Sequence, residues 1–235
     1  MLAGLLLALC VAMPAYVAAA EVELQAYTAT YSVKGRGISL GTAEISLQPF
    51  EDMWRWRMTT EANAFVSLFT DEEPFSETIF TWNSDGLRLQ NIHIGDENGD
   101  KGAETADFDW VGGEVDMVRK RKRRQAQLVD EVYDLQSVHL RAAMMQAKRE
   151  DETSFQLYYK GKLRDSKLVY LGSESLWIGE RKIDARVYEH SIVNSDKALK
   201  YYYEAARPLV PVLIENRKSG KSHSELRLQS VDGQP

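Results

Sequence analysis

The stretch Asp134–Arg149, with the sequence DLQSVHLRAAMMQAKR, has the clearest helical pattern in the chain. Asp134 suits the N-cap position, because its carboxylate can accept hydrogen bonds from the free amides of the first turn. Lys148 and Arg149 stand in the last turn, where positive charge complements the helix dipole. The apolar residues are Leu135, Val138, Ala142 and Met145 on one face, with Leu140 and Met144 on the other side. A helix that is apolar on more than one side is expected to be buried.

Strand-like segments lie on both sides of this helix. They are rich in β-branched and aromatic residues and are separated by short turns that contain Gly, Asn, Asp or Pro. In 53–62, for example, Trp54, Trp56 and Met58 alternate with Arg55 and Arg57, which is typical of a strand with one buried face. The predicted strands are 26–34, 38–48, 53–62, 75–82, 86–94, 103–110, 114–128, 153–160, 163–176, 181–193, 198–204, 210–217 and 222–231.

Short connections between consecutive strands predict antiparallel neighbours. So many strands in one sheet must curl or close on themselves. The predicted fold class is therefore mainly β: a large antiparallel curled sheet, an open or closed barrel-like roll, packed around one α-helix at about 134–149. Residues 21–235 show neither an internal repeat nor a Pro- or Ser-rich linker, and we interpret them as one domain.

The first 20 residues resemble a secretory signal peptide. Leu2–Met13 is almost wholly apolar, and Ala18–Ala20 precedes the first charged side chain, Glu21. This pattern predicts cleavage between Ala20 and Glu21, and hence export to the periplasm. The basic residues that usually start such a segment are missing, so an uncleaved N-terminal anchor is the alternative.

Cysteine usage and charge exclude several classes of protein. Cys10 is the only cysteine and lies inside the apolar segment after Leu9, which does not fit a lipoprotein signal. A mature chain without disulfides must rely on its core. The formal net charge of −6 and the predicted export argue against nucleic-acid binding.

Several short motifs, taken in order, resemble an uncharacterised exported family of Gram-negative bacteria. They are YSVKGRGISLGTAEISL at 31–47, FDW at 108–110, YDLQSVHLR at 133–141, and the aromatic segment Tyr201–Tyr203 followed by LVPVLIE at 209–215. The family is the domain of unknown function numbered three thousand one hundred and eight. This resemblance implies a periplasmic location and a β-rich fold, and it assigns neither an activity nor a site.

Two groups of residues are candidates for binding. An aromatic set could line a concave apolar surface that holds a lipid or another envelope-derived ligand, or it could only fill the core: Trp54, Trp56, Phe65, Phe69, Trp82 and Trp110. A basic run, Arg119, Lys120, Arg121, Lys122, Arg123 and Arg124, could bind lipid headgroups or an acidic protein surface. It could equally be a solvated strand end that blocks edge pairing, with Glu104 opposite Arg121 across a turn at Gly112–Gly113.

The remaining motifs point more weakly to chemistry. Gly37–Gly41, GISLG, matches the nucleophile elbow of serine hydrolases, but TAEISLQ after it alternates like a strand, so we interpret the glycines as turn and bulge positions. Asp96, Asn98 and Asp100 have calcium-loop spacing without the glycine and glutamate that such a loop requires. The four histidines, His93, His139, His190 and His223, lack metal-ligand spacing, and His139 is expected to be a hydrogen-bonded core residue.

Three functions remain after these exclusions. The first is a non-enzymatic periplasmic protein that binds an apolar or envelope-derived ligand inside the curled sheet. The second is an envelope interaction or scaffold protein that docks through the basic run. The third is a hydrolase that acts on envelope polymers. We predict neither a cofactor nor a metal, and the sequence leaves the oligomeric state open.

Overall fold

A computed structural model describes residues 22–63, 74–83, 86–96 and 99–233. For residue 96 and residues 99–102 it describes the backbone alone. The predicted signal peptide, Phe65, Phe69 and the central part of the predicted calcium loop lie outside these residues. Fifteen strands precede and follow one helix: β1 Tyr27–Gly35, β2 Ile38–Phe50, β3 Met53–Ala62, β4 Pro74–Asn83, β5 Gly86–Asp96, β6 Gly99–Asp109, β7 Glu114–Arg119, β8 Lys122–Gln127, β9 Val132–Asp134, α1 Val138–Lys148, β10 Glu152–Tyr158, β11 Leu163–Ile178, β12 Arg181–Ile192, β13 Lys197–Glu204, β14 Pro211–Lys218 and β15 Lys221–Asp232.

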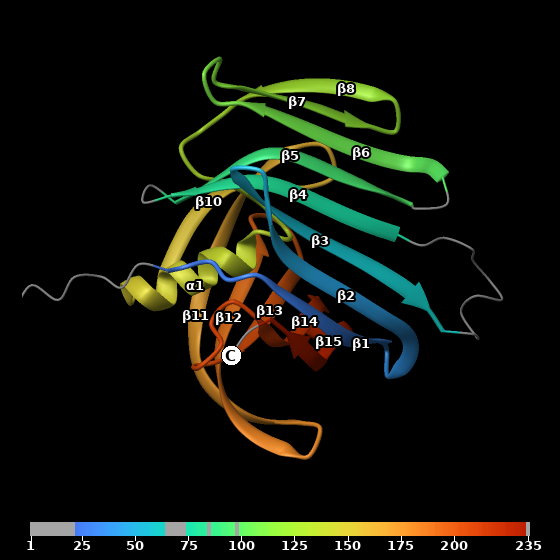
Figure 1. The fold of residues 1–235 in the computed structure, drawn as a ribbon, viewed down its shortest axis with the longest axis vertical. Coiled ribbons are helices and arrows are strands. Elements are labelled where there is room, and N and C mark those ends of the chain that lie inside the picture. The colour runs from blue at the N-terminus through green and yellow to red at the C-terminus, as the bar shows by residue number, and fades with distance from the viewer. Residues whose placement is uncertain (1–21, 64–73, 84–85, 97–98, 234–235) are drawn as a thin grey trace, which may run out of the picture.

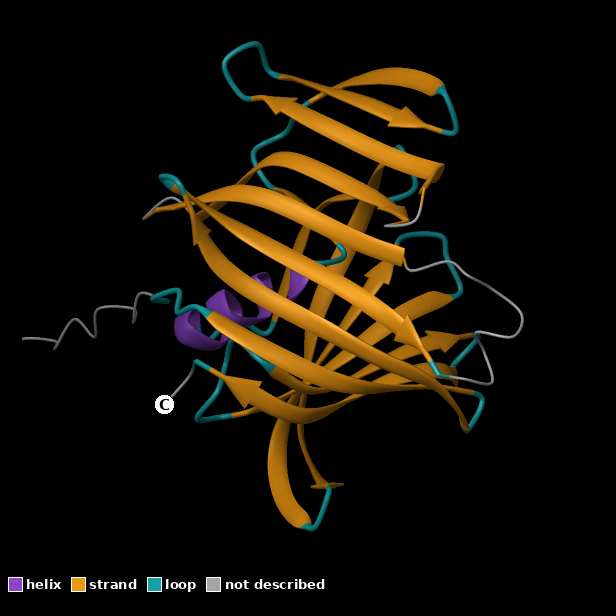
Figure 2. Ribbon diagram, turned by 45° about the vertical axis from the view of Figure 1, so that its right-hand side comes forward, coloured by secondary structure: helices purple, strands orange, loops and turns teal. Residues whose placement is uncertain are grey.

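All the strands belong to one sheet. Its order is β8-β7-β6-β5-β4-β3-β2-β1-β15-β14-β13-β12-β11-β10-β9, and the first and last members do not pair. Neighbours are antiparallel except β9 and β10, which run parallel. The sheet curls around α1, with β1–β5 on one side of the helix and β10–β14 on the other (Figures 1 and 2). The predicted class is therefore confirmed as the open form of the curled sheet.

The helix is buried as its sequence predicts, but it begins later than predicted. Every residue from Val138 to Met145 is buried, because the sheet surrounds the helix. Asp134 is not its N-cap: this residue ends β9, and its Oδ1 accepts a hydrogen bond from the Ser137 backbone N–H at 2.7 Å. Ser137 holds the N-cap position, and the left-handed residue Arg149 ends the helix.

Side chains close the seam between the two halves of the sheet, where no ladder of backbone hydrogen bonds exists. The buried Asp134 carboxylate accepts a hydrogen bond from the Thr78 hydroxyl of β4. The buried Glu104 carboxylate of β6 accepts one from the Gly161 amide at 2.8 Å and pairs with Arg119 Nε at 2.7 Å. These contacts join β4 and β6 to the β9–β10 end of the sheet, so the open sheet encloses a core.

The hairpin after β6 differs from the sequence prediction. The predicted single strand 114–128 is two strands, β7 and β8, joined by a turn at Lys120 and Arg121. Both residues adopt positive φ angles, 50° and 62°. Glu104 pairs with Arg119 rather than with Arg121, because the turn between β6 and β7 spans residues 110–113 and not the two glycines alone. This turn could not be predicted from the sequence, because Lys and Arg seldom occupy left-handed positions, which favour Gly, Asn and Asp.

Candidate functional site

A pocket of about 200 Å³ lies between the start of α1 and the inner face of the sheet. Strands β1, β2, β3, β13, β14 and β15 and the β9–α1 connection provide its walls. The apolar lining residues are Ile45, Met58, Leu135, Leu199, Pro211, Ile214 and Leu226, and the polar or aromatic ones are Tyr27, Trp56, Gln136, His139 and Tyr201. Among the described residues, no Asp, Glu, Lys or Arg lines the pocket, so it suits an uncharged, largely apolar group.

Three of the polar side chains in this pocket lie next to one another. Trp56 is 4% exposed, and no described group accepts a well-aligned hydrogen bond from its indole N–H, although the Tyr27 hydroxyl lies beside it. The Tyr27 hydroxyl lies 3.4 Å from His139 Nε2. The His139 Nδ1 contacts the Gln136 carbonyl oxygen. Tyr27 thus lies between the Trp56 indole and the His139 ring, so the polar groups of this wall face one another.

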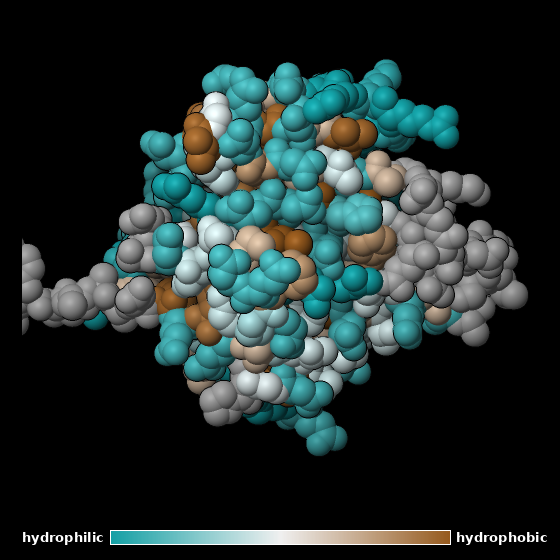
Figure 3. All heavy atoms as spheres, turned by 45° about the horizontal axis from the view of Figure 1, so that its top comes forward, coloured by the Kyte–Doolittle hydropathy of each residue, from teal (hydrophilic) through white to brown (hydrophobic). Residues whose placement is uncertain are grey.

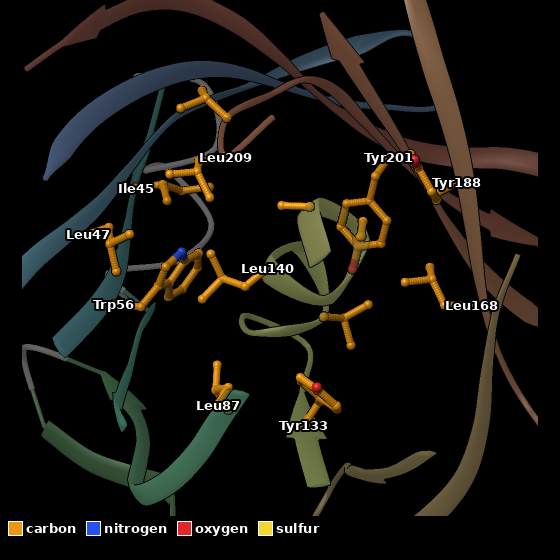
Figure 4. Close-up of a cluster of buried hydrophobic side chains, with 14 of the residues drawn as sticks. Ile45, Leu47, Trp56, Leu87, Tyr133, Leu140, Leu168, Tyr188, Tyr201 and Leu209 are labelled. Atoms are coloured by element: carbon orange, nitrogen blue, oxygen red, sulfur yellow. The ribbon is translucent and has the colours of Figure 1, made fainter. Parts of the chain in front are cut away.

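Burial sets the protonation of these groups. Desolvation lowers the pKa of His139 to about 4, against the favourable effect of the Gln136 carbonyl on the charged form. Burial also raises the pKa of Tyr27 well above its usual value. Both side chains are therefore neutral at pH 7, and the whole wall of the pocket is uncharged. Figure 4 shows Trp56 and Tyr201 extending toward the helix from strands on its two sides.

The structure separates the members of the predicted aromatic set. Trp56 lines the pocket, whereas Trp54 packs against the edge of the core. Trp82 and Trp110 also pack there, and their indole N–H groups donate to the carbonyl oxygens of Val22 at 3.1 Å and Leu89 at 2.6 Å. The hydrogen-bonding capacity of these two tryptophans is thus already used within the fold.

A second pocket of about 100 Å³ adjoins the first one. The two pockets share Leu135 and Leu199 in their walls. The second pocket is more polar, since Lys197, His190 and Asn216 contribute to its wall. His190 is 2% exposed, and its Nε2 has no hydrogen-bond partner within the described ranges.

The predicted basic run lies at the tip and on the outer strand of the β7–β8 hairpin. Arg119 pairs with Glu104, and Arg123 pairs with Asp116 at 3.1 Å. The other four cations are exposed or nearly so and make no ion pair with a described residue: Lys120, Arg121, Lys122 and Arg124. Hydrophilic residues cover most of the face that includes this hairpin (Figure 3). Partial self-neutralisation, as the sequence suggested, leaves a smaller cationic surface.

The GISLG segment does not form a nucleophile elbow. Ser39 lies in β2, on an exposed part of the strand, rather than in a strand-to-helix turn. Gly37 lies in the β1–β2 turn and adopts a positive φ of 82°. Gly41 sits where the β1–β2 register shifts, and a Cβ at this position would lie 1.9 Å from the Glu61 carbonyl oxygen. These glycines are turn and bulge positions, as the sequence predicted.

The described part of the chain was also compared with the requirements of a metal site and of a membrane-spanning helix. It contains no group of three or more His, Cys, Asp or Glu side chains placed to hold a metal ion. No helix there combines the length and apolar character needed to cross a membrane. His139 is confirmed as a hydrogen-bonded core residue, and it also contributes to the pocket wall.

Sequence reasoning missed most of the pocket. Its walls come from residues as distant along the chain as Tyr27, Leu135, Tyr201 and Leu226. One signal was available: Leu135 and His139 lie four residues apart, on one side of a helix that the sequence identifies well. Their partners on the sheet follow only from the strand order.

The fold and the pocket define a class of protein: a β-barrel-like protein whose open, curled sheet encloses one helix. The chain belongs to the family described as protein of unknown function DUF3108, whose model matches residues 26–221. Comparison with curated proteins gives no match. Among solved structures, a similar one is the crystal structure of a beta-barrel-like protein of domain of unknown function DUF1849 from Brucella abortus. It has 8% sequence identity and a TM-score of 0.58, with 90% of this chain and 98% of that chain covered, so the likeness concerns the fold alone.

Proposed function

We propose that this chain is an exported, periplasmic protein that binds an apolar ligand in the pocket beside α1, without catalysing a reaction on it. The supporting observation is the uncharged, largely apolar pocket beside α1. Drug-sized ligands usually occupy pockets of roughly 300–1,000 Å³. At about 200 Å³, this pocket fits a single hydrocarbon chain or a small ring better than a lipid with two chains.

The first test is mass spectrometry under non-denaturing conditions on protein purified from a periplasmic extract, followed by organic extraction. The expected result is a chain of Glu21–Pro235 that carries a small apolar adduct. A bare chain that also fails to take up dodecanol in vitro would contradict the proposal.

A pair of variants separates the pocket from nonspecific binding. Leu226→Trp places a large ring in the pocket wall and should abolish dodecanol binding while the protein stays folded. Leu171→Trp is the matched control, because Leu171 is 47% exposed on β11 and lies outside the pocket. Equal dodecanol binding by both variants would show that the ligand binds elsewhere.

A second candidate function is docking to an acidic envelope surface through the β7–β8 hairpin. The four cations without an ion pair favour it, since they concentrate positive charge on a protein whose net charge is −6. The same charges also protect the edge strand β8 from pairing with other chains.

Replacing Lys120, Arg121, Lys122 and Arg124 with Gln should abolish sedimentation with vesicles that contain anionic phospholipid. Removing the paired Arg119 and Arg123 instead should weaken it less. Unchanged sedimentation of the fourfold variant would contradict docking through the hairpin. The role of these cations would then be to protect the edge strand β8 from pairing with other chains.

A further inference from the structure

The two adjoining pockets differ in polarity, so polarity changes from one pocket to the other. The larger pocket, beside Trp56, is apolar and uncharged, whereas the smaller one has Lys197, His190 and Asn216 in its wall. The side chains of Leu135 and Leu199 line both pockets. A leucine side chain can change rotamer without a movement of the backbone. A ligand with a hydrocarbon chain can therefore extend past Leu135 and Leu199 from one pocket into the other.

Three lysines continue from the smaller pocket along the edge of the sheet. Lys197 of β13 lies directly opposite Lys218 of β14, which lies directly opposite Lys221 of β15. Side chains directly opposite one another share a face, with Cβ atoms roughly 4.5–5.5 Å apart, and like charges placed so are destabilising. All three lysines are exposed.

This row of lysines is not ion-paired within the described residues. None of the three lysines makes an ion pair there. Asp196, the acidic neighbour of Lys197, instead accepts a hydrogen bond from the Ser219 hydroxyl at 3.0 Å. The three positive charges of the row therefore exceed the single negative charge of Asp196 beside them. An anion bound there would remove the repulsion.

His190 adds a second, independent indication. Its ring stacks on Phe155, with centroids 5.8 Å apart and planes inclined by 14°, which fixes its orientation in the wall of the smaller pocket. Its buried Nε2 lacks a partner. In the tautomer protonated at Nε2, this nitrogen would donate a hydrogen bond to an anionic oxygen.

We propose that the ligand is a single-chain amphiphile with an anionic head group, which is a carboxylate or a phosphate. The head group binds beside Lys197, Lys218 and His190, and the hydrocarbon chain passes between Leu135 and Leu199 to the Trp56 pocket. This inference rests on the proposed function, and it adds the charge of the ligand and its direction in the protein.

The test compares three probes that share a twelve-carbon chain. They are 12-bromododecanoic acid, 12-bromododecanol and dodecyl phosphate, each titrated into the purified protein by calorimetry. Charge-assisted hydrogen bonds are stronger than neutral ones, so the acid or the phosphate should bind about tenfold or more tightly than the alcohol. The tighter of the two anionic probes identifies the head group as carboxylate or phosphate.

Lysine variants locate the head group. In Lys197→Gln/Lys218→Gln, the preference for the anionic probes should fall to within about twofold of the alcohol. The control Lys182→Gln, at an exposed position next to the β11–β12 turn, should keep the full preference. Because both lysines are exposed, the double variant should melt no lower than the wild type, which keeps loss of folding apart from loss of binding.

Fluorescence establishes the direction of the chain. Bromine at the far end of the acid should quench tryptophan emission, and Trp56→Phe should remove most of that quenching when each protein is compared at a probe concentration that calorimetry shows to be saturating. Undiminished quenching in Trp56→Phe would overturn the assigned direction. Equal affinity for acid and alcohol would overturn the anionic head group but leave the proposed function standing. Binding of none of the probes would overturn both.

Discussion

Buried histidines should make this protein sensitive to mild acid. His139 and His190 are 4% and 2% exposed, and desolvation lowers the pKa of each to about 4. In the unfolded chain a histidine titrates near 6.5. Between these values the unfolded state binds more protons than the folded state, so stability is complete above about pH 6.5 and is lost as the pH falls toward 4. Each histidine should lower the free energy of unfolding by about 2 kcal/mol at pH 5 and about 3 kcal/mol at pH 4.

The substitution His190→Phe isolates one of the two contributions. Phenylalanine keeps the stacking on Phe155 and removes the titrating group, and the adjoining pocket gives its extra atom room. Between pH 7 and pH 5 the variant should lose about 2 kcal/mol less stability than the wild type in urea unfolding. His223→Phe, at an exposed position, is the control and should follow the wild type.

Asp134 acts in the opposite direction but does not obscure the comparison. Its burial raises its pKa, so its protonation favours the folded state as the pH falls. Wild type and variant share this contribution, and it cancels in their difference. Parallel loss of stability in wild type and His190→Phe would refute the reasoning, because it would mean that His190 is accessible to water in the folded protein.

Three further predictions concern the sheet. Gly41→Ala should destabilise the protein by about 1–3 kcal/mol in urea unfolding, since the new methyl group would meet a backbone carbonyl of β3; a smaller loss would mean that the strands can separate there. Glu104→Gln should cost about 1–3 kcal/mol, because Arg119 and the seam lose a charged acceptor, and an unchanged urea midpoint would show that the seam contributes nothing. Replacing Lys120 and Arg121 with Asn and Gly should raise stability by about 1 kcal/mol, as both positions have positive φ; a lower melting temperature would contradict the turn geometry.

Local pattern was sufficient to predict the main elements. Helix-spaced apolar residues from Val138 to Met145 identified the buried helix, and alternation such as that of Trp54, Trp56 and Met58 identified the strands. Both signals work because side-chain direction repeats with a fixed period in regular structure. The short connections also indicated an antiparallel sheet that must curl. The Lys120–Arg121 turn escaped detection, since its residues are not those that turns usually select.

The sequence by itself determined the fold class, the central helix and the turn and bulge roles of Gly37 and Gly41, because each depends on neighbours along the chain. Tertiary structure alone decided that the sheet stays open, that Asp134 and Glu104 close its seam, and which residues line the pocket. It also decided that three lysines stand side by side on neighbouring strands. The physical reason is that register and curvature bring distant strands together, and no local pattern encodes which side chains then meet.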